Sequence, residues 1–416
     1  LATGLGRDRG ANWNERLRVH FRASGDRLMS VNQSGTVVDQ GYIGGFKQVS
    51  MPYSFNTQAI ISDGRMFLHD GAQLKEVTDP DLGSPIDGVW IDGYYFLTDG
   101  EYLFHTNIAD EFTIDPLTFA TAEFSPDPTL GLGTTQDNKV IVFGRYTTEY
   151  FQNIASENFA FTRLSNRALK VGIVGTHAKC ELAGQWFIMG GRKEESPSIG
   201  IISVSGYQQM ATREIDKIIS EYSETELENV VLESRQDDAN QFLIVRLPRH
   251  TLLFNLTLAG KLGADNAWSI LKVGTGNDAM KLSNGVFDPR SSKWVYGESD
   301  STRIGTLERD ISTYFDEPIE VIFHSPQIDL KSISIRSVEM DTIPGFTIDD
   351  ASVMMSMSYD GLTYGKEQSL VYGANSSHNL NFGARRLGNV TKDFNFKFRS
   401  VSTSRLIFSK LTVNYG

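Results

Sequence analysis

From Leu17 to about Ile311, short apolar runs alternate with turns rich in Gly, Asp, Asn and Ser. Antiparallel strands joined by tight connections give this pattern, because a strand needs only a few residues and Gly and Asp suit the turns between strands. The runs that best fit such strands are RLRVHFRA at Arg16, RMFLHDG at Arg65, YYFLTDGEYLFHT at Tyr94, KVIVFGRYTTEYF at Lys139, QWFIMGG at Gln185, QFLIVRLPRHTLLF at Gln241 and KWVYGES at Lys293. The pattern predicts an all-β region built from one repeated hairpin.

The spacing of these hairpins favours a β-propeller. Successive hairpins begin about 30 to 55 residues apart, close to the repeat length of a propeller blade. Blades packed around an axis bury their apolar faces and leave only short edges exposed. We therefore predict about six or seven blades. Ring closure should bring the region from Arg16 to Asn32 against the region from Trp294 to Leu307.

Asp-Gly pairs punctuate the first third of the chain. In such pairs Gly adopts a positive φ at little cost and Asp caps its own turn. We expect the pairs to be turn residues without a catalytic role; they begin at Asp63, Asp70, Asp87, Asp92 and Asp99.

One helical insertion interrupts the strands at about residues 212–232. Ile215, Ile218, Ile219 and Tyr222 recur at the spacing of one helix face. Thr212 is a candidate N-cap, and Ser223 with Glu226 forms the pattern of a capping box for a second short helix. We expect the insertion to pack on a blade; contact with a neighbouring subunit is the alternative.

Beyond Asp316 the strands become longer and alternate more regularly between polar and apolar positions, as in DFNFKFRSVSTS. This change predicts a separate C-terminal β-sandwich. We place the propeller at residues 1–316 and the sandwich at 317–416, with the boundary near Glu317-Pro318.

Composition and charge exclude several classes of function. Hydrophobic residues are 40% and charged residues 22% of the 416 residues, typical of a folded globular chain. No apolar run approaches the roughly 20 residues that cross a bilayer. The net charge of −12 should repel phosphate, so tight DNA binding is not expected. The single cysteine, Cys180, is expected to be a buried inert thiol, since His177 should lie on the opposite face of its strand.

The sequence contains no motif for catalysis, metal binding or cofactor binding. The seven histidines form no HExxH pair, and no phosphate-binding loop is present. We therefore expect neither an enzyme nor a cofactor. A sialidase-like propeller glycoside hydrolase is the enzymatic alternative, because it needs only two facing carboxylates. SYDGLTY at Ser358 is one residue short of an Asp-box, and a hairpin explains it better. Trp13, in a polar Asn-rich segment, is a candidate interface residue.

Several strings resemble a known family from Thr147 onward: TTEYF, GIVGTHAKC at Gly172, IDKIISEYSETELENVVLESRQ at Ile215 and, most specifically, FLIVRLPRHTLLFN at Phe242. SYDGLTYGKEQ and RRLG in the terminal region are similar as well. The chain resembles the packaged-DNA stabilisation, or tail-hub, proteins of short-tailed bacteriophages of the Salmonella and Shigella type. On this basis the candidate interface residues are Arg246, Arg249, His250, Arg385 and Arg386; for Arg249 and His250, capping of a hairpin is an equal alternative.

The resemblance implies a virion protein of the tail, assembled in the host cytoplasm. It implies a hexameric ring below the portal-adaptor that continues and closes the DNA channel, retains packaged DNA, and holds the tail needle or plug and the tailspikes or tail fibres. Six copies would carry roughly 72 negative charges, which would let double-stranded DNA pass without sequence-specific binding. A host-receptor-binding tail component is a further alternative. No autonomous oligomerisation element is visible, so we expect docking to the adaptor to set the geometry of the ring.

Overall fold

The computed structural model describes residues 2–108, 110–122, 124–203, 206–308, 311–330, 332–342, 351–373 and 382–416. The chain divides into two compact units. Unit 1 comprises Leu1–Leu271 and Lys281–Thr306, and unit 2 comprises Lys272–Met280 and Leu307–Gly416. Each unit is described by itself.

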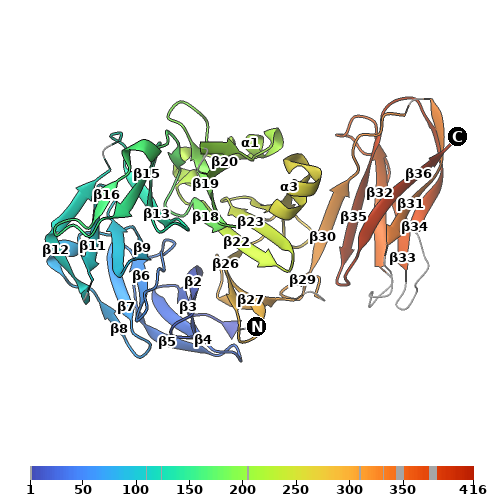
Figure 1. Cartoon of the computed structure of the whole chain (residues 1–416). Helices are drawn as coiled ribbons and strands as arrows, with labels where there is room; N and C mark the ends of the chain where they lie inside the picture. Colours follow the sequence, from blue (N-terminus) through green and yellow to red (C-terminus); the bar gives the residue numbers. More distant parts are fainter. Residues whose placement is uncertain are drawn as a thin grey trace. The chain divides into compact units, whose positions relative to one another are not determined.

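Among the described residues, unit 1 holds seven sheets, numbered here as blades 1 to 7 in chain order (Figure 1). Blades 1 to 3 contain β2 (Asp8–Asn14), β3 (Val19–Ser24), β4 (Arg27–Val31) and β5 (Val37–Tyr42); β6 (Gln58–Ser62), β7 (Arg65–His69) and β8 (Leu74–Glu76); and β9 (Asp87–Ile91), β10 (Tyr94–Thr98), β11 (Tyr102–Asn107) and β12 (Asp110–Thr121). Blades 4 and 5 contain β13 (Thr129–Thr134), β14 (Val140–Gly144), β15 (Thr148–Asn153) and β16 (Phe161–Arg163); and β17 (Gly172–Ile173), β18 (Lys179–Leu182), β19 (Gln185–Gly191), β20 (Ser198–Ser203) and β21 (Gly206–Gln209). Blades 6 and 7 contain β22 (Val231–Asp237), β23 (Asn240–Arg246), β24 (Thr251–Asn255) and β25 (Trp268–Leu271); and β26 (Leu282–Asp288), β27 (Lys293–Glu298) and β28 (Arg303–Leu307), joined by β1 (Ala2–Thr3). The propeller prediction is confirmed.

The ring closes where the two ends of unit 1 meet. Strand β1 completes blade 7 by pairing with β28, with Ala2 opposite Ile304. Met29 and Val31 of blade 1 pack with Val295 and Ile304 of blade 7. The expected meeting of the first and last blades is therefore observed, but the strand shared across the closure precedes the expected region.

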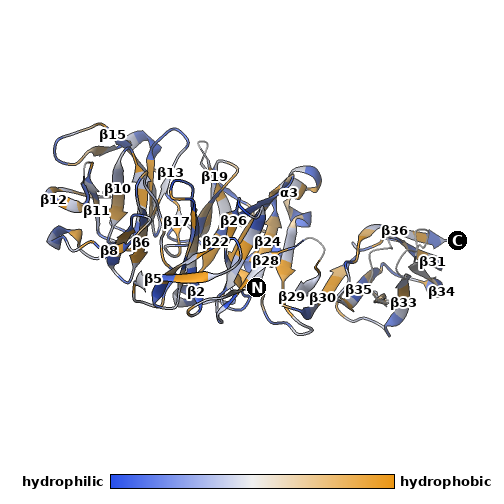
Figure 2. Cartoon of the chain, turned by 90° about the horizontal axis from the view of Figure 1, so that it is seen from below, coloured by the Kyte–Doolittle hydropathy of each residue, from blue (hydrophilic) through white to orange (hydrophobic). Residues whose placement is uncertain are grey.

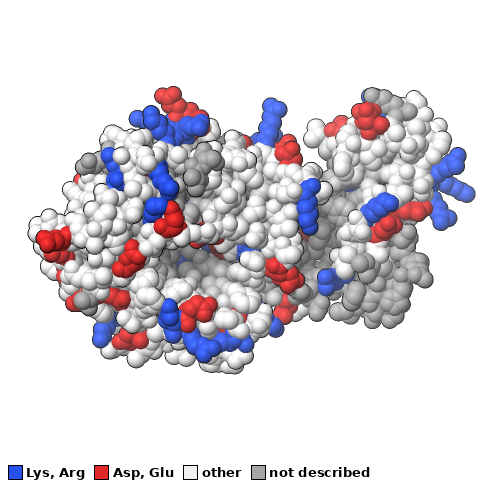
Figure 3. Space-filling view, in the orientation of Figure 1, with Lys and Arg blue, Asp and Glu red and all other residues white. Residues whose placement is uncertain are grey.

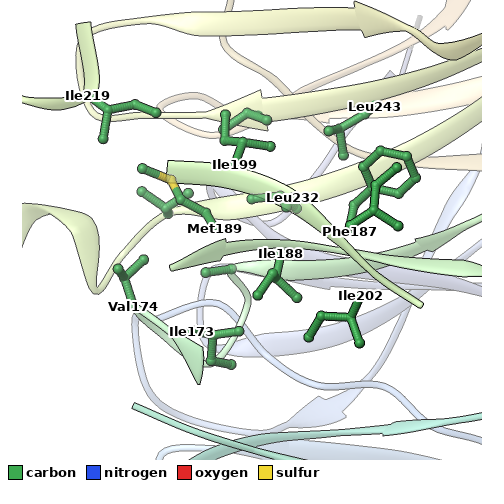
Figure 4. Close-up of a cluster of buried hydrophobic side chains, with 14 of the residues drawn as sticks. Ile173, Val174, Phe187, Ile188, Met189, Ile199, Ile202, Ile219, Leu232 and Leu243 are labelled. Carbon is green, nitrogen blue, oxygen red and sulfur yellow. The ribbon is translucent and has the colours of Figure 1, made fainter. Parts of the chain in front are cut away.

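Hydrophobic packing between neighbouring blades holds the ring together. The largest buried cluster extends across blades 4, 5 and 6. Figure 4 shows part of it, where Ile188 and Met189 of β19 lie close to Leu232 of β22 and Leu243 of β23. Hydrophobic residues line the strands of unit 1 (Figure 2), and central strands such as β14 are buried along their whole length, so each blade presents apolar side chains to the blades on both sides.

The helical insertion packs on this cluster. It forms α1 (Arg213–Ile219) and α2 (Glu224–Leu227). The predicted caps are present: Thr212 Oγ1 accepts from the Ile215 backbone N–H, and Ser223 and Glu226 form a capping box. The buried side chains Ile215, Ile219, Tyr222 and Leu227 belong to the blade cluster. The other helical segments are α3 (Leu256–Leu262) and the 3₁₀ turns η1 (Pro80–Leu82), η2 (Ser165–Arg167) and η3 (Ala264–Asn266).

Unit 2 is a β-sandwich. One sheet has the order β29-β30-β35-β32-β33 and the other the order β34-β31-β36. The strands are β29 (Thr313–Tyr314), β30 (Glu317–His324), β31 (Ile333–Thr342), β32 (Ala351–Ser358), β33 (Gln368–Gly373), β34 (Phe382–Val390), β35 (Asn395–Ser402) and β36 (Phe408–Tyr415). Phe396 and Phe398 are buried between the sheets, whereas the alternating Lys397 and Arg399 are partly exposed. The sandwich prediction is confirmed.

Candidate functional site

Polar side chains from several blades meet at the propeller axis. Asp87, the first residue of β9 in blade 3, is buried. Its carboxylate lies 2.9 Å from Nζ of Lys179, which is on β18 in blade 5. Its carboxylate also accepts from Ser50 Oγ at 2.5 Å and from the Leu132 backbone N–H at 2.8 Å. Asp87 on blade 3 is therefore joined directly to blades 4 and 5 and to Ser50, which bridges to β6 of blade 2.

The surroundings of Asp87 and His177 set the protonation state of each side chain. Burial alone would raise the pKa of Asp87, but Lys179, His177 and the hydrogen bonds from Ser50 and Leu132 outweigh it and leave the pKa below its ordinary value. Burial, with Lys179 as the next cause, lowers the pKa of His177 to about 4. At neutral pH the axis therefore holds a neutral imidazole beside an ionised pair.

A cavity of about 630 Å³ opens at the same axis. The surface of unit 1 is hollowed near its centre in Figure 3. At the cavity, Arg16 lies 4.5 Å from the ring centroid of Phe55, and Phe55 meets Trp90 edge to face at 4.7 Å. The other lining residues include Asn12, Val49, Met51, Asp87, His177 and Lys179.

Two more ion pairs lie where blades 6, 7 and 1 meet. Arg22 donates to Asp8 at 2.6 Å and to the backbone oxygens of Asn284 and Val295 at 3.1 Å each. Arg246 lies 2.6 Å from Glu233, and that carboxylate also accepts from the backbone N–H of Asn284 at 2.9 Å. Each of these carboxylates is matched by a cation, as Asp87 is by Lys179. Arg246 therefore serves the packing of the blades within this chain.

The other residues of the RLPRH string clasp the helical insertion. Arg249 lies 2.6 Å from Glu226 and stacks 4.4 Å from the ring centroid of Tyr222. The Tyr222 hydroxyl lies 2.6 Å from His250 Nδ1 and accepts from the Arg249 backbone N–H at 3.2 Å. Both residues sit in the turn between β23 and β24, where the Leu247 N–H donates to the His250 oxygen. They are hairpin-turn residues that also fasten α1 and α2.

The remaining candidate interface residues occupy opposite environments. Trp13 is only 8% exposed, and the Arg290 guanidinium lies 4.9 Å from its ring centroid. Its side chain is therefore part of the core of unit 1 and is not presented at the surface of this chain. Arg385 and Arg386 are exposed on β34 of the sandwich. The structure does not bring these two together with Arg246, Arg249 and His250 within one unit.

Catalytic chemistry finds little support at these sites. Across the described ranges, no three His, Cys, Asp or Glu side chains group as a metal site requires. Burial raises the pKa of the Cys180 thiol well above its ordinary value, so it is not a thiolate nucleophile. In SYDGLTY, Asp360 accepts from the backbone N–H groups of Leu362 and Thr363, as a hairpin turn requires.

The Asp-Gly expectation fails at one of its five positions. Asp63 and Asp92 adopt positive φ in tight turns between strands. Asp87 instead opens β9 and pairs with Lys179. The signal was available, because Asp87 follows Ser-Pro-Ile and precedes the apolar run, whereas the other pairs follow one. An Asp at the first position of a propeller strand therefore predicts a place at the axis as well as it predicts a turn.

The fold and its ion-paired axis define a protein built from a β-propeller and a β-sandwich. Comparison with known proteins gives the family. The model described as "Bacteriophage P22 Gp10, beta-propeller" matches residues 1–312, and the one described as "Bacteriophage P22 Gp10, beta-sandwich" matches residues 320–416. The chain belongs to the bacteriophage P22 Gp10 family.

A relative from a Salmonella phage agrees with this assignment. The chain is 26% identical over 421 residues to the tail hub protein gp10 of Salmonella phage P22, covering 97% of this chain and 87% of the relative. Among solved structures, virginiamycin B lyase from Staphylococcus aureus matches with a TM-score of 0.48 at 10% identity, over 72% of this chain and 94% of that one. YCF48 from Cyanidioschyzon merolae matches with a TM-score of 0.44 at 10% identity, over 71% and 94%.

This relationship confirms the main functional expectations. As a homologue of a tail hub protein, the chain is a structural component of a bacteriophage tail and not an enzyme. Its place is in the virion tail, where it assembles with other tail and portal components. In the part of the chain that the structure describes, no helix is long and apolar enough to span a bilayer.

Proposed function

We propose that six copies of this chain form a ring below the portal-adaptor, which continues the DNA channel and closes the head after packaging. The ring retains packaged DNA and holds the tail needle or plug and the tailspikes or tail fibres. The copies assemble onto virions in the host cytoplasm. The observation that carries this proposal is the match of both domains to one tail-hub family along nearly the whole chain.

The propeller axis supports a channel that lies between copies. Asp87 and Lys179 bridge the axis at 2.9 Å, and Gln48 donates to Asn284 across blades. A duplex has no path through one propeller, so DNA must pass along a surface to which several copies contribute. We further propose that this surface is acidic, since a net charge of −12 per copy opposes adhesion of DNA during ejection.

The functional division of the chain falls, in this proposal, between residues 1–316 and 317–416. The sandwich would then be free to make contacts different from those of the propeller. Which of the adaptor, needle and spikes each part meets is a question for the assembled tail.

Deleting the gene for this chain from its phage tests the proposal. We expect heads that package DNA and then lose it, measured as nuclease-sensitive DNA and empty heads in micrographs, with rescue by the chain supplied in trans. Heads that keep their DNA without the chain would contradict the proposed closing role. A variant with Asp99→Asn, a partly buried turn position where the amide oxygen can still accept from the Glu101 and Tyr102 backbone N–H groups, serves as the matched rescue control.

A further inference from the structure

An arginine cluster on the sandwich has no assigned role. It consists of Arg336 on β31 and Arg385 and Arg386 on β34, all exposed. In the view of Figure 3, Lys and Arg side chains stand out on one side of unit 2. None of the three makes an ion pair with any residue in the described ranges, whereas the exposed Arg249 and the partly exposed Arg399 do.

Two β-bulges create this cluster. In a regular strand successive side chains point to opposite faces, so Arg385 and Arg386 could not both face solvent. Ala384 is buried and Leu387 packs on the sandwich core, so the two arginines between them both turn outward. The register of β31 shifts between Ile335 and Ser337 relative to both β34 and β36. Arg336 therefore lies at the bulge, beside Arg385 and Arg386 of the neighbouring strand.

The backbone is strained to allow this arrangement. Arg386 has φ +59°, a left-handed conformation that glycine or asparagine adopts more easily than arginine. Backbone strain of this kind is enriched at functional sites, and β-bulges re-aim side chains. Glu339 on the same sheet accepts from Ser337 Oγ at 3.1 Å and does not neutralise the cluster.

The charge of the chain favours one partner. Residues 317–416 contain ten acidic and ten basic residues, so the net charge of −12 resides in residues 1–316. The acidic propeller repels a DNA duplex that approaches this protein. The same acidic propeller is complementary in charge to an arginine cluster on a neutral sandwich. Arginine also binds carboxylates through two parallel hydrogen bonds, which fixes orientation as well as charge.

We infer that Arg336, Arg385 and Arg386 form a docking surface for the acidic propeller of a second copy of this chain. The inference rests on the proposed ring, in which each copy presents two different surfaces to its neighbours. Sandwich-to-propeller contact would supply one such pair of surfaces.

Cross-linking in assembled tails tests this inference. In R385K/R386K the positive charge stays, and a carbodiimide joins the introduced amines to carboxylates in contact with them. Tails built from mixed ¹⁴N and ¹⁵N copies distinguish links between copies from links within one copy. We expect mixed-isotope links to Asp or Glu within residues 1–316. Links confined to one copy or to another tail protein would overturn the inference, and absence of the chain from tails would instead refute the proposed function.

A charge-reversal pair gives the second measurement. R385E/R386E should reduce incorporation of the chain into tails at least tenfold, while K366E/K392E, with the same change in net charge at exposed sandwich positions, should not. Circular dichroism of both purified variants checks folding. A duplex-binding assay by fluorescence anisotropy separates the other outcome: loss of DNA binding with normal incorporation in R385E/R386E would assign the cluster to DNA and overturn the inference.

Discussion

At the residue scale, the ion pairs of the axis decide what this propeller can do. Lys179 is 9% and Asp87 4% exposed at the side chain, so each is stabilised mainly by the other and by hydrogen bonds. Such a pair adds little net stability relative to apolar residues, but removing one partner leaves an uncompensated buried charge. The pair therefore fixes the blades relative to one another and is poorly suited to turnover.

Asp87→Asn tests this reading. We expect unit 1 to lose about 3 to 5 kcal/mol of unfolding free energy, because Lys179 stays buried without its counter-charge. Asp87→Asn with Lys179→Met should lose less than Asp87→Asn alone. Urea titration followed by tryptophan fluorescence reports on unit 1, since all five tryptophans lie in it. Asp99→Asn is the control, with an expected change under about 0.5 kcal/mol.

His20 should make unit 1 sensitive to acid. Its side chain is fully buried, and burial, with Arg22 as the next cause, lowers its pKa from 6.5 to about 3. The unfolded chain takes up a proton below pH 6.5 and the folded chain does not until about pH 3. Stability therefore falls as pH drops through this window, by up to about 1.4 kcal/mol per pH unit from this group.

Urea titrations of His20→Gln between pH 7 and 4 measure that contribution. We expect a shallower loss of stability with falling pH than in the unaltered chain. Phe21→Leu, a neighbouring core change without a titrating group, should keep the original slope. Equal slopes in all three proteins would show that His20 is not the acid-sensitive group.

The role of a residue could be predicted from the sequence where local conformation decides it, and not where a distant contact does. The Asp-Gly turns at Asp63 and Asp92 follow from the local conformational freedom of the pair. Asp87 has the same two letters and a different role, because its partner Lys179 lies 92 positions away and tertiary contacts decide its environment. Trp13 was expected at an interface because its sequence neighbours are polar; within this chain its side chain is 8% exposed, and a contact with another subunit stays a prediction.

At the element scale, the helical insertion is a fastened part of the propeller. The Tyr222 hydroxyl joins His250 and the Arg249 backbone, which ties α1 and α2 to the hairpin of β23 and β24. This insertion could be predicted in detail, since helix periodicity and a capping box are local signals. Strand β1 and the bulge at Arg386 could not, because both depend on pairing with distant strands.

Tyr222→Phe should loosen the insertion without disturbing the blades. The aromatic ring stays packed, and the two hydrogen bonds of the hydroxyl group are lost. We therefore expect the free energy of unfolding to fall by about 1 to 2 kcal/mol. Hydrogen exchange should speed up across residues 213–227 more than in β23. Tyr42→Phe, at a residue 54% exposed, is the matched control and should change neither quantity.

Arg22 is the clearest test of ring closure. It is fully buried and joins Asp8 of β2 to backbone oxygens of β26 and β27. Arg22→Met removes the counter-charge of the buried Asp8, which keeps only its hydrogen bonds from Ser283 and Asn284, and we expect a loss of at least about 3 kcal/mol by tryptophan fluorescence. Arg27→Met removes an exposed pair with Asp39 and should cost under about 1 kcal/mol. Similar losses in the two variants would mean that Arg22 does not hold the ring closed.

At the scale of the whole molecule, two features point to assembly. The propeller is closed at its axis by Asp87 and Lys179, and the sandwich carries exposed arginines without partners in the described ranges. The all-β class, the propeller and the sandwich all followed from strand periodicity and spacing. The contacts between copies did not, because a single sequence records both sides of such a contact without marking which residues meet.

Electron cryomicroscopy of the tail of the phage that encodes this chain tests the central claim most directly. We predict density for a ring of copies around the DNA channel below the portal-adaptor, with each propeller closed at its own axis and duplex density passing between copies. Tails that lack the chain would contradict the account. Single copies found only at the distal tip, where a receptor-binding component would lie, would contradict it as well.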